Sequence, residues 1–367
     1  MVKKESQFQP NYAVPPGESL RETLESLGMS QAELAQRTGR PKKTINEIIF
    51  GKAAITPETA LQLERVLGIP ASFWNNLERN YQEARARLED DRRLHSQKNW
   101  VNSFPIAALS RAGWLSKEKS EVNKLKALLK FFGVSGTNEW DRLWQSSQPT
   151  YRTSPAFQKN PYAVSAWLRL GEIQAKGYGC KPYSGNSFRA SLNRIRALTT
   201  EPVEIFEPRM KQICAEAGVA VVFVPELPGT RAFGATRWLN PTKALMQLSL
   251  RGKSDDHLWF TFFHEAGHVL LHGKRDVFIE ADGEGAGRVI TNEKEQEADR
   301  FAEDRLIPPR EYRDFMKRGQ FGLKAIRDFA ARLHIAPGIV VGRLQHDKAI
   351  PFSQGNSLKK RFQFPGD

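Results

Sequence analysis

The sequence predicts an α+β fold that is mainly α-helical, with one small β-sheet and at least two domains. Apolar residues recur at helical spacing through most of the chain, and glycines or prolines end several of these stretches. Residues 220–250 instead carry β-branched residues in short runs that are typical of strands. The chain has 367 residues, which is too long for one typical hydrophobic core.

Composition narrows the class of protein. The chain is 40% hydrophobic and 26% charged, as soluble globular proteins are, and it has no apolar run of the roughly 18 residues that a membrane span requires. Its N-terminus leads into no apolar signal segment, and Cys180 and Cys214 lack metal-type spacing. We therefore expect a cytoplasmic protein without a membrane partner. The net charge of +14 favours a polyanionic partner, nucleic acid first.

Four short helices are predicted in the first seventy residues. Ser30-Gln31-Ala32-Glu33 matches a capping box, in which the Ser30 hydroxyl and the Glu33 carboxylate satisfy each other's free backbone donors. The first helix opens at Pro16-Gly17-Glu18 and is ended by Gly28, and the second runs from Gln31 to Thr38 and is stopped by Gly39. The third has Pro41 in its first turn and is ended by Gly51, and the fourth starts at Thr56-Pro57 and is followed by Gly68.

The second and third of these helices form a predicted helix-turn-helix, because a tight turn with a glycine joins them inside a compact bundle. The third helix would enter the major groove of double-stranded DNA. Lys42 and Lys43 would bind phosphates or guanine, and Asn46 would read adenine. Gln31 lies at a helix N-terminus that suits a phosphate, and Thr44 faces outward with the lysines. The alternative is a protein-interaction bundle with a solvated basic face.

Residues 11–82 resemble HigA-type antitoxins of the Cro/C1 helix-turn-helix class. The resemblance is carried, in one register, by Pro16-Gly17-Glu18, Ser30–Ala35, Gly51–Ala60 and Leu67–Leu77. The resemblance implies a repressor that binds an operator as a homodimer. Some members of this class are paired with an RNA-cleaving toxin, so a cognate toxin is an expected partner of this chain. The third helix begins Arg40-Pro41-Lys42-Lys43 where such proteins often have a small hydroxyl residue, so the operator sequence is not predicted.

The middle of the chain is predicted to be helical. A long polar helix from Phe73 to about Gln97 leads us to interpret residues 83–103 as a helical linker, with a dimer contact as the alternative. Residues 104–200 are predicted to form amphipathic helices, interrupted by a loop at Gln145–Asn160. Three tryptophans in this region are interpreted as core residues rather than as a surface for nucleobases: Trp140, Trp144 and Trp167.

A helix at Pro208–Ala217 is predicted to lead into a buried strand at Ala220–Val224. Gly229–Trp238 and Lys243–Leu250 then form a predicted hairpin, with Asn240-Pro241 at the turn. An edge strand of this kind can pair with an extended peptide. Alternatively, the strands only cover the apolar face of the helix that follows.

The pentapeptide His264-Glu265-Ala266-Gly267-His268 carries the clearest chemistry. Residues four apart lie on one face of a helix, so His264 and His268 can bind one Zn²⁺ ion, and Glu265 beside them can act on a water. Ser254-Asp255-Asp256 is expected to cap this helix. Three apolar residues are expected to bury it: Phe260, Phe263 and Val269. The pattern predicts a zinc hydrolase site.

A catalytic zinc needs a third protein ligand, and an acidic helix follows between about Thr291 and Pro308. Glu295 is the preferred ligand because the small residues on its face permit close helix packing. On the same face, Asp299 would accept the free ring N–H of a zinc-bound histidine. Glu297 shares a face with Phe301 instead and is the alternative ligand.

These residues suggest the hydrolysis of an amide bond. Zinc would lower the pKa of a water, and Glu265 would accept its proton and pass it to the leaving amine. His272 and Arg237 are candidates for stabilising the oxyanion. His257 and His272 also lie on the predicted metal face, where we expect a supporting or ordinary core role rather than ligation.

Residues 104–344 resemble the ImmA/IrrE-type metallopeptidase family, which implies a zincin-like domain, here residues 201–346. The resemblance is carried by Trp259–His268, Glu295–Ala302 and Leu306-Ile307-Pro308. It implies that zinc binds His264, His268 and Glu295 and that Glu265 is the catalytic base. Known members cleave helix-turn-helix repressors, so the expected substrate is a regulatory protein. This chain departs from them by carrying its own DNA-binding domain.

Two short helices are predicted at Ala325–Leu333 and Pro337–Leu344. Residues 347–367, with Lys359-Lys360-Arg361, are expected to form a solvated basic tail, with contact to DNA phosphates as the alternative. Two functions follow from the whole chain. One is a DNA-binding transcriptional regulator with a zinc endopeptidase domain. The other is a non-enzymatic antitoxin-like autorepressor whose second domain only binds or senses a partner, and only the first has a use for Glu265.

Overall fold

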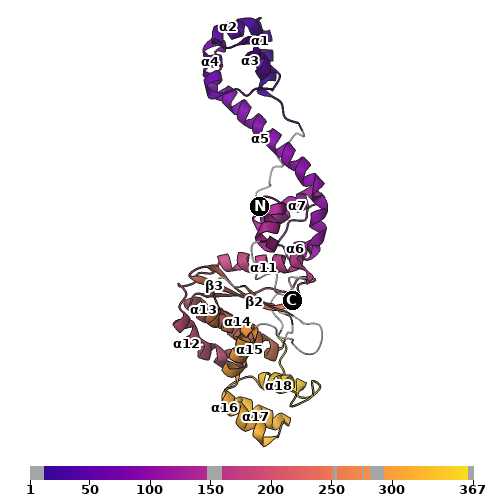
Figure 1. The fold of residues 1–367 in the computed structure, drawn as a ribbon, viewed down its shortest axis with the longest axis vertical. Coiled ribbons are helices and arrows are strands. Elements are labelled where there is room, and N and C mark those ends of the chain that lie inside the picture. The colour runs from indigo at the N-terminus through magenta and orange to yellow at the C-terminus, as the bar shows by residue number, and fades with distance from the viewer. Residues whose placement is uncertain are drawn as a thin grey trace. The chain divides into compact units, whose positions relative to one another are not determined.

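The computed structural model describes residues 12–146, 159–249, 251, 254–274, 277–281 and 293–362 (Figure 1). The chain divides into two compact units, residues 1–99 and 100–367. Both units are helical and the second also holds a four-stranded sheet, so the predicted α+β class is confirmed. Among the described helices, none is both long and apolar enough to cross a membrane.

The first unit contains α1 (Pro16–Ser26), α2 (Gln31–Thr38), α3 (Lys42–Ile49), α4 (Pro57–Leu67) and α5 (Ala71–Ser96). Each helix contributes a fully buried side chain to one shared core: Leu20, Leu34, Ile45, Leu63 and Trp74. The predicted long helix is confirmed and begins two residues earlier than expected. Apolar residues at helical spacing therefore predicted all five helices correctly, because a helix with one apolar face is stable only when that face is buried.

The helix ends in this unit agree with the predicted ones except in two details. Glu33 N donates to Ser30 Oγ at 3.1 Å, as a capping box requires. The other predicted hydrogen bond of the capping box, from the Ser30 backbone N–H to the Glu33 carboxylate, is wrong, because this carboxylate pairs with Arg37 at 2.6 Å instead. Pro41 lies immediately before α3 rather than in its first turn.

Gly17 allows α1 to approach α3 closely. A Cβ atom on this residue would lie 2.1 Å from the carbonyl oxygen of Ile48, so no larger side chain fits there without moving the helix. The second helix of the helix-turn-helix is therefore held by direct backbone contact.

The second unit begins with helices that precede the sheet. They are α6 (Ile106–Arg111), α7 (Glu121–Phe132), α8 (Thr137–Trp140), the π-helical turn η2 (Asp141–Ser146), α11 (Pro161–Lys176), α12 (Gly185–Arg196), η3 (Ala197–Thr200) and α13 (Val203–Glu216), after the 3-10 turn η1 (Lys98–Ser103). The predicted start of α13 at Pro208 is wrong, because Val203 and Phe206 are buried and extend the helix by a turn on its N-terminal side. Most of the predicted loop at Gln145–Asn160 lies outside the described residues.

The helices that follow the first three strands along the chain are α14 (Asp255–Leu271), α15 (Glu293–Leu306), α16 (Pro309–Arg318), α17 (Leu323–Leu333), α18 (Pro337–His346) and η4 (Asn356–Leu358). Both short helices predicted near the C-terminus are confirmed. Helix α16 was not predicted, because Pro308-Pro309 is typical of the end of a helix. Pro309 is in fact the first residue of a helix, a position where its missing N–H costs nothing.

The sheet has the strand order β1-β3-β2-β4. Its strands are β1 (Val219–Phe223), β2 (Ala232–Asn240), β3 (Lys243–Leu248) and β4 (Phe278–Ala281). The predicted hairpin is confirmed, since β2 and β3 pair antiparallel. The idea that this hairpin offers an edge strand beside the motif helix is wrong, because β4 pairs antiparallel with the free side of β2. β4 is only four residues long, which is too short for a clear sequence signal.

Each face of the sheet packs against its own set of helices. Val219 and Val221 of β1 point into a core shared with α13 and α14, whereas Ala220 and Val222 point into a core shared with α7 and α11. This alternation is the two-residue period of a strand that is buried on both faces. The three tryptophans are buried in the second core, as predicted: Trp140, Trp144 and Trp167.

Most residues from 351 to 361 are exposed, as expected for a solvated tail, but the end of the described tail packs on the second unit. Phe362 is buried, and Arg361 forms a bridge with Ser254, next to the start of α14. Lys359 Nζ lies 2.6 Å from a carboxylate oxygen of Asp256. Lys359 therefore neutralises an acidic residue of the same unit, whereas Lys360 and Arg361 are exposed. The sequence alone did not indicate this, because the two segments are about a hundred residues apart.

Candidate metal centre

The metal motif lies on α14, which is buried along most of its length. Phe262 and Phe263, just before the motif, and Ala266, inside it, have no exposed surface, so core packing fixes the position of the helix. Ser254 is the N-cap residue of α14, as predicted from Ser254-Asp255-Asp256, but its hydroxyl makes no capping hydrogen bond. Instead, Asp255 Oδ1 accepts hydrogen bonds from the backbone N–H of Asp256 at 3.0 Å and of Lys360 at 3.1 Å.

The structure brings His264, His268 and Glu295 together. The two Nε2 atoms are 2.9 Å apart, and Glu295 Oε2 lies 3.2 Å from that of His264 and 3.5 Å from that of His268. A tetrahedral zinc ion about 2.05 Å from each ligand requires ligand atoms about 3.3 Å apart. The three distances lie close to this value, so the donor set and its spacing fit a zinc ion with a fourth position left for water.

Glu295 reaches the histidines because α15 packs very closely on α14. A Cβ atom on Gly267, between the two histidines, would lie only 3.1 Å from the Cα of Ala298. Two small residues therefore let the helix backbones approach. The alternative ligand Glu297 points elsewhere, since its Oε2 lies 3.0 Å from Nε2 of His272 and its side chain is 59% exposed.

Both candidate ligand histidines have a partner on their other ring nitrogen. His264 Nδ1–H donates to Asp299 Oδ1 at 2.8 Å. The Nδ1 atoms of His268 and His272 are 2.9 Å apart, and His272 Nε2–H donates to Glu297. With that proton assigned to His272 Nε2, His268 Nδ1–H is the donor in the histidine pair. Both Nε2 lone pairs are then available for a metal, as in other sites where outer contacts orient the ligands.

The electrostatics of the site favour one positive charge between these groups. Burial alone would lower the pKa of His264, but Glu280, Asp299 and Glu295 together raise it well above its usual value. Burial lowers the pKa of His268 to about 4. Although burial opposes it, hydrogen bonding to the two imidazoles holds the pKa of Glu295 well below its usual range. A proton on His264 can supply the charge, and so can a metal ion.

Glu265 is fully buried, and among the described residues neither of its carboxylate oxygens has a hydrogen-bond partner. Burial raises its pKa to about 8; His264 opposes this rise and Glu280 adds to it. A Cβ atom on Gly234 of β2 would lie 2.5 Å from Glu265 Oε1, so only glycine leaves room for this carboxylate. A buried carboxylate with an unused hydrogen-bonding capacity is suited to act on a water or a substrate amine.

Glu280 of β4 also lies at the site, although the sequence did not predict it. Its carboxylate lies within 4.8 Å of potential ligand atoms of both His264 and Glu265, and the residue is only 7% exposed. On the same strand, the Phe278 ring stacks on His268 with the ring centres 3.9 Å apart. Phe278 and Glu280 are two residues apart, so in a strand they lie on one face. A strand of only four residues, however, could not be recognised from the sequence.

Two residues suggested for the site lie elsewhere. Arg237 is next to Thr236 on β2 but points to the opposite face of the sheet, where its guanidinium donates to the Leu168 carbonyl at 2.6 Å. The oxyanion role suggested for it is therefore wrong. His257 is exposed and stacks with Phe233, so a core role for this residue is also wrong. His272 contacts His268, in the supporting position that was expected as one alternative.

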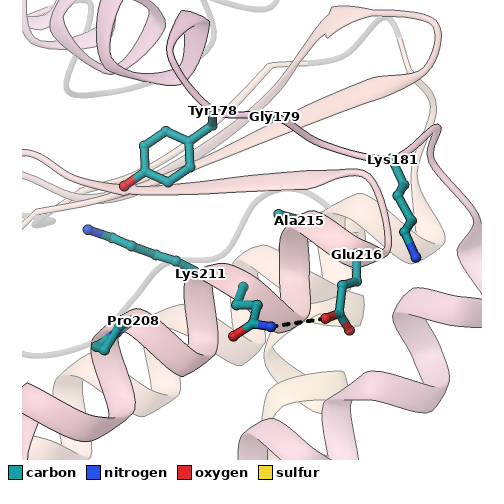
Figure 2. Close-up of a pocket in the computed structure, with 8 residues that line it drawn as sticks. Tyr178, Gly179, Lys181, Pro208, Lys211, Ala215 and Glu216 are labelled. Atoms are coloured by element: carbon teal, nitrogen blue, oxygen red, sulfur yellow. Dashed lines mark hydrogen bonds between the residues drawn. The ribbon is translucent and has the colours of Figure 1, made fainter.

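A separate pocket of about 490 Å³ lies away from these residues, between α13 and the segment that follows α11 (Figure 2). Tyr178 and Lys211 face each other across it, and Gln212 donates to Glu216 along α13 at 3.3 Å. Lys211 is already paired with Glu207 at 2.6 Å. No residue of the metal motif lines this pocket.

In the first unit, the predicted DNA-binding residues lie on α2 and α3. Lys42, Lys43 and Asn46 are exposed, and Gln31 and Thr44 are partly exposed. Asn46 Nδ2 donates to Gln31 Oε1 at 3.4 Å, so these two side chains lie side by side.

Two protein families match this chain. Residues 20–74 match the helix-turn-helix family, and residues 221–345 match the IrrE N-terminal-like domain. The second match contains the whole metal motif, Glu280 and Glu295.

Two similar proteins each match about a fifth of the chain. It is 35% identical over 86 residues to the uncharacterized HTH-type transcriptional regulator YddM of Escherichia coli, which corresponds to 22% of this chain and 92% of that protein. It is 40% identical over 70 residues to virulence-associated protein I of Dichelobacter nodosus, with 19% of this chain and 65% of that protein covered.

Solved structures with similar sequences include those of an antidote protein and of an antitoxin. An addiction module antidote protein of the HigA family from Coxiella burnetii is 32% identical over 23% of this chain and 92% of its own, with a TM-score of 0.22. Antitoxin HigA of Pseudomonas aeruginosa, solved with the higBA promoter, is 31% identical over 22% of this chain and 90% of its own, also with a TM-score of 0.22. The family matches and the YddM similarity identify the chain as a Cro/C1-type helix-turn-helix regulator that carries an IrrE-like domain of the peptidase family in its second unit.

Proposed function

We propose that this regulator is a zinc-dependent endopeptidase that binds operator DNA and cleaves a regulatory protein. The observation that carries the enzymatic half is the triangle formed by His264, His268 and Glu295, with the buried carboxylate of Glu265 beside it. A module that only bound a partner would have no need to bury a carboxyl group there, since burial of a polar group without a hydrogen bond is costly.

Each residue of the site has one role in this proposal. His264, His268 and Glu295 hold the zinc, which when bound polarises the scissile carbonyl and acidifies water. Glu265 accepts the proton of the attacking water and donates it to the leaving amine. Asp299 and His272 keep the two imidazoles in the tautomer that leaves Nε2 free, and so act only through the ligands.

Metal analysis with matched variants tests the enzymatic half. We expect the purified protein to hold one zinc ion, Glu265→Gln to hold one as well, and His264→Ala to hold none. Only the wild type should cleave peptides from a proteome-derived library, because Glu265→Gln lacks the base but keeps the ligands. If the wild type holds no stoichiometric zinc, the non-enzymatic alternative replaces this proposal.

For the DNA-binding half, we propose that α3 enters the major groove. Lys42 and Lys43 neutralise phosphates, Asn46 reads a base edge, and Gln31 and Thr44 contact the backbone beside them. The support is the exposure of α3 and the proximity of Asn46 to Gln31.

Binding to the protein's own promoter tests this half. Lys42→Ala with Lys43→Ala should weaken binding to all DNA sequences and reduce the slope of log K against log salt by about 2. Arg65→Ala, an exposed residue on α4, serves as the control and should leave both quantities unchanged. An unaltered slope in the double variant would show that α3 is not the phosphate-binding helix.

The remaining partners are proposals by analogy with the relatives. We expect a homodimer on a two-fold operator, a cytoplasmic location together with the DNA, and a cognate toxin whose gene lies beside this one. Analytical ultracentrifugation and sequencing of the neighbouring genes test the first and the last.

A further inference from the structure

The positive charge of the chain lies mostly outside the helix-turn-helix unit. Of the net charge of +14, residues 1–99 carry +2 and residues 100–367 carry +12. The segment from α16 to the end of the described tail, residues 309–362, has 12 lysines and arginines against 4 aspartates and glutamates, which is a net charge of +8. The polyanionic partner that the net charge favours therefore has a candidate surface in the second unit as well.

Six basic side chains on α16 and α17 carry part of this charge at the surface. Within the described part of the chain none of them forms an ion pair, whereas the exposed Arg87 and Arg93 of α5 pair with Glu83 and Asp90. The six exposed residues are Arg310, Arg313, Lys317, Arg318, Lys324 and Arg327.

The helices α16 and α17 form an antiparallel hairpin at one end of the second unit (Figure 1). The rings of Phe315 and Phe329 stack with their centres 4.1 Å apart, and Glu311 Oε2 lies 3.2 Å from Arg332 Nη2. The later residue of α16 thus meets the earlier residue of α17, so the end of α16 lies beside the start of α17. We call the four basic residues there the basic cluster: Lys317, Arg318, Lys324 and Arg327.

Helix stability alone does not explain the basic cluster. A helix dipole favours cations in the last turn, as at Lys317 and Arg318, but disfavours them in the first turn. Lys324 is in the first turn of α17, which holds no acidic residue. Asp314 and Asp328 are exposed on the same helices and form no ion pair with the cluster among the described residues. The four like charges repel one another, so binding of an anion with several charges would stabilise them.

We propose that α16 and α17 bind the phosphate backbone of double-stranded DNA without reading its sequence, as a contact separate from the one at α3. DNA is the polyanion that fits, because the same chain carries a helix-turn-helix of the DNA-binding regulators. A bound operator presents its flanking phosphates to this surface at a high effective concentration. The next helix, α18, packs on α14 and six of its ten residues are buried, so it is not free to enter a groove and read bases.

The salt dependence of binding to DNA without an operator tests the proposal in the full-length protein. A long mixed-sequence duplex that lacks the promoter is titrated at several salt concentrations. The slope of log K against log salt changes by about 0.9 for each phosphate contact. Replacement of all four residues of the basic cluster by glutamine should therefore reduce the slope by about 2 or more and weaken binding by about 10-fold or more at low salt.

Matched variants separate a local contact from an effect of net charge. The control removes the same charge from four exposed residues on and between α6 and α7: Arg111→Gln, Lys117→Gln, Lys119→Gln and Lys130→Gln. It should keep the slope of the wild type. Lys317→Arg with Lys324→Arg keeps the charge and should also bind as the wild type does. If circular dichroism shows that the fourfold cluster variant is unfolded, Lys324→Gln with Arg327→Gln should reduce the slope by about 1 or more.

An unchanged slope in the folded cluster variant would overturn the inference, and so would an equal fall in the control. Binding to phosphatidylcholine vesicles with one-fifth phosphatidylserine is measured in parallel. A cluster variant that loses vesicle binding but keeps the DNA slope would assign the cluster to a membrane surface and overturn the inference equally. Lys42→Ala with Lys43→Ala tests α3 on the promoter, so the two DNA contacts can fail independently.

Discussion

Asp299 offers the sharpest test of how the two helices build the metal centre. Its Oδ1 accepts a hydrogen bond from His264 at 2.8 Å, and the residue is 9% exposed. Contacts of this kind contribute about 10- to 100-fold to zinc affinity, or about 1.4 to 2.7 kcal/mol. Asp299→Asn keeps an acceptor for the ring N–H but loses the charge, so we expect the lower value. Asp299→Ala loses both, so we expect the higher one.

Competition with a chromophoric chelator at neutral pH measures these affinities. Asp304→Asn, an exposed carboxylate one turn further along α15, is the matched control and should bind zinc as the wild type does. Circular dichroism checks that each variant is folded. If folded Asp299→Ala binds zinc within 3-fold of the wild type, Asp299 does not orient His264, and the reasoning from this contact is refuted.

Three further experiments probe the same unit. Glu295→Gln should weaken zinc binding by more than about 100-fold, the upper limit for outer contacts, whereas Glu297→Gln should weaken it by about 10-fold or less; the reverse order would make Glu297 the ligand. Gly234→Ala should reduce peptide cleavage by about 100-fold while zinc is retained, because its Cβ displaces the Glu265 carboxylate; unchanged cleavage would contradict that contact. Burial, aided by Asp256, raises the pKa of Asp255 from 3.8 to about 7. Between these values the folded protein keeps a proton that the unfolded chain has lost, so the free energy of unfolding should fall by up to about 4 kcal/mol as the pH rises. Urea unfolding at pH 4.5 and pH 7.5 should show this loss in the wild type but not in Asp255→Asn. An equal loss of unfolding free energy in both proteins would argue against it.

Much of the fold was predictable because its signals are local. The helices of the first unit each carry an apolar stripe and a proline, serine or glycine at an end, and such signals act within a few residues. The errors arose where distant segments decide. α13 extends before Pro208 because Val203 and Phe206 find a core, and the Lys359 ammonium group is largely withdrawn from solvent because the Asp256 carboxylate lies beside it.

The candidate site divides in the same way. The sequence by itself determined that His264, Glu265 and His268 share one region of a helix, because a spacing of four residues fixes their direction. It also favoured Glu295 over Glu297, since small residues on one face predict close helix packing. Only the tertiary structure decided that Glu297 supports His272, that Arg237 points away, and that Glu280 joins the site. Those outcomes depend on strand pairing and helix contact between segments far apart in the chain, and no local pattern encodes them.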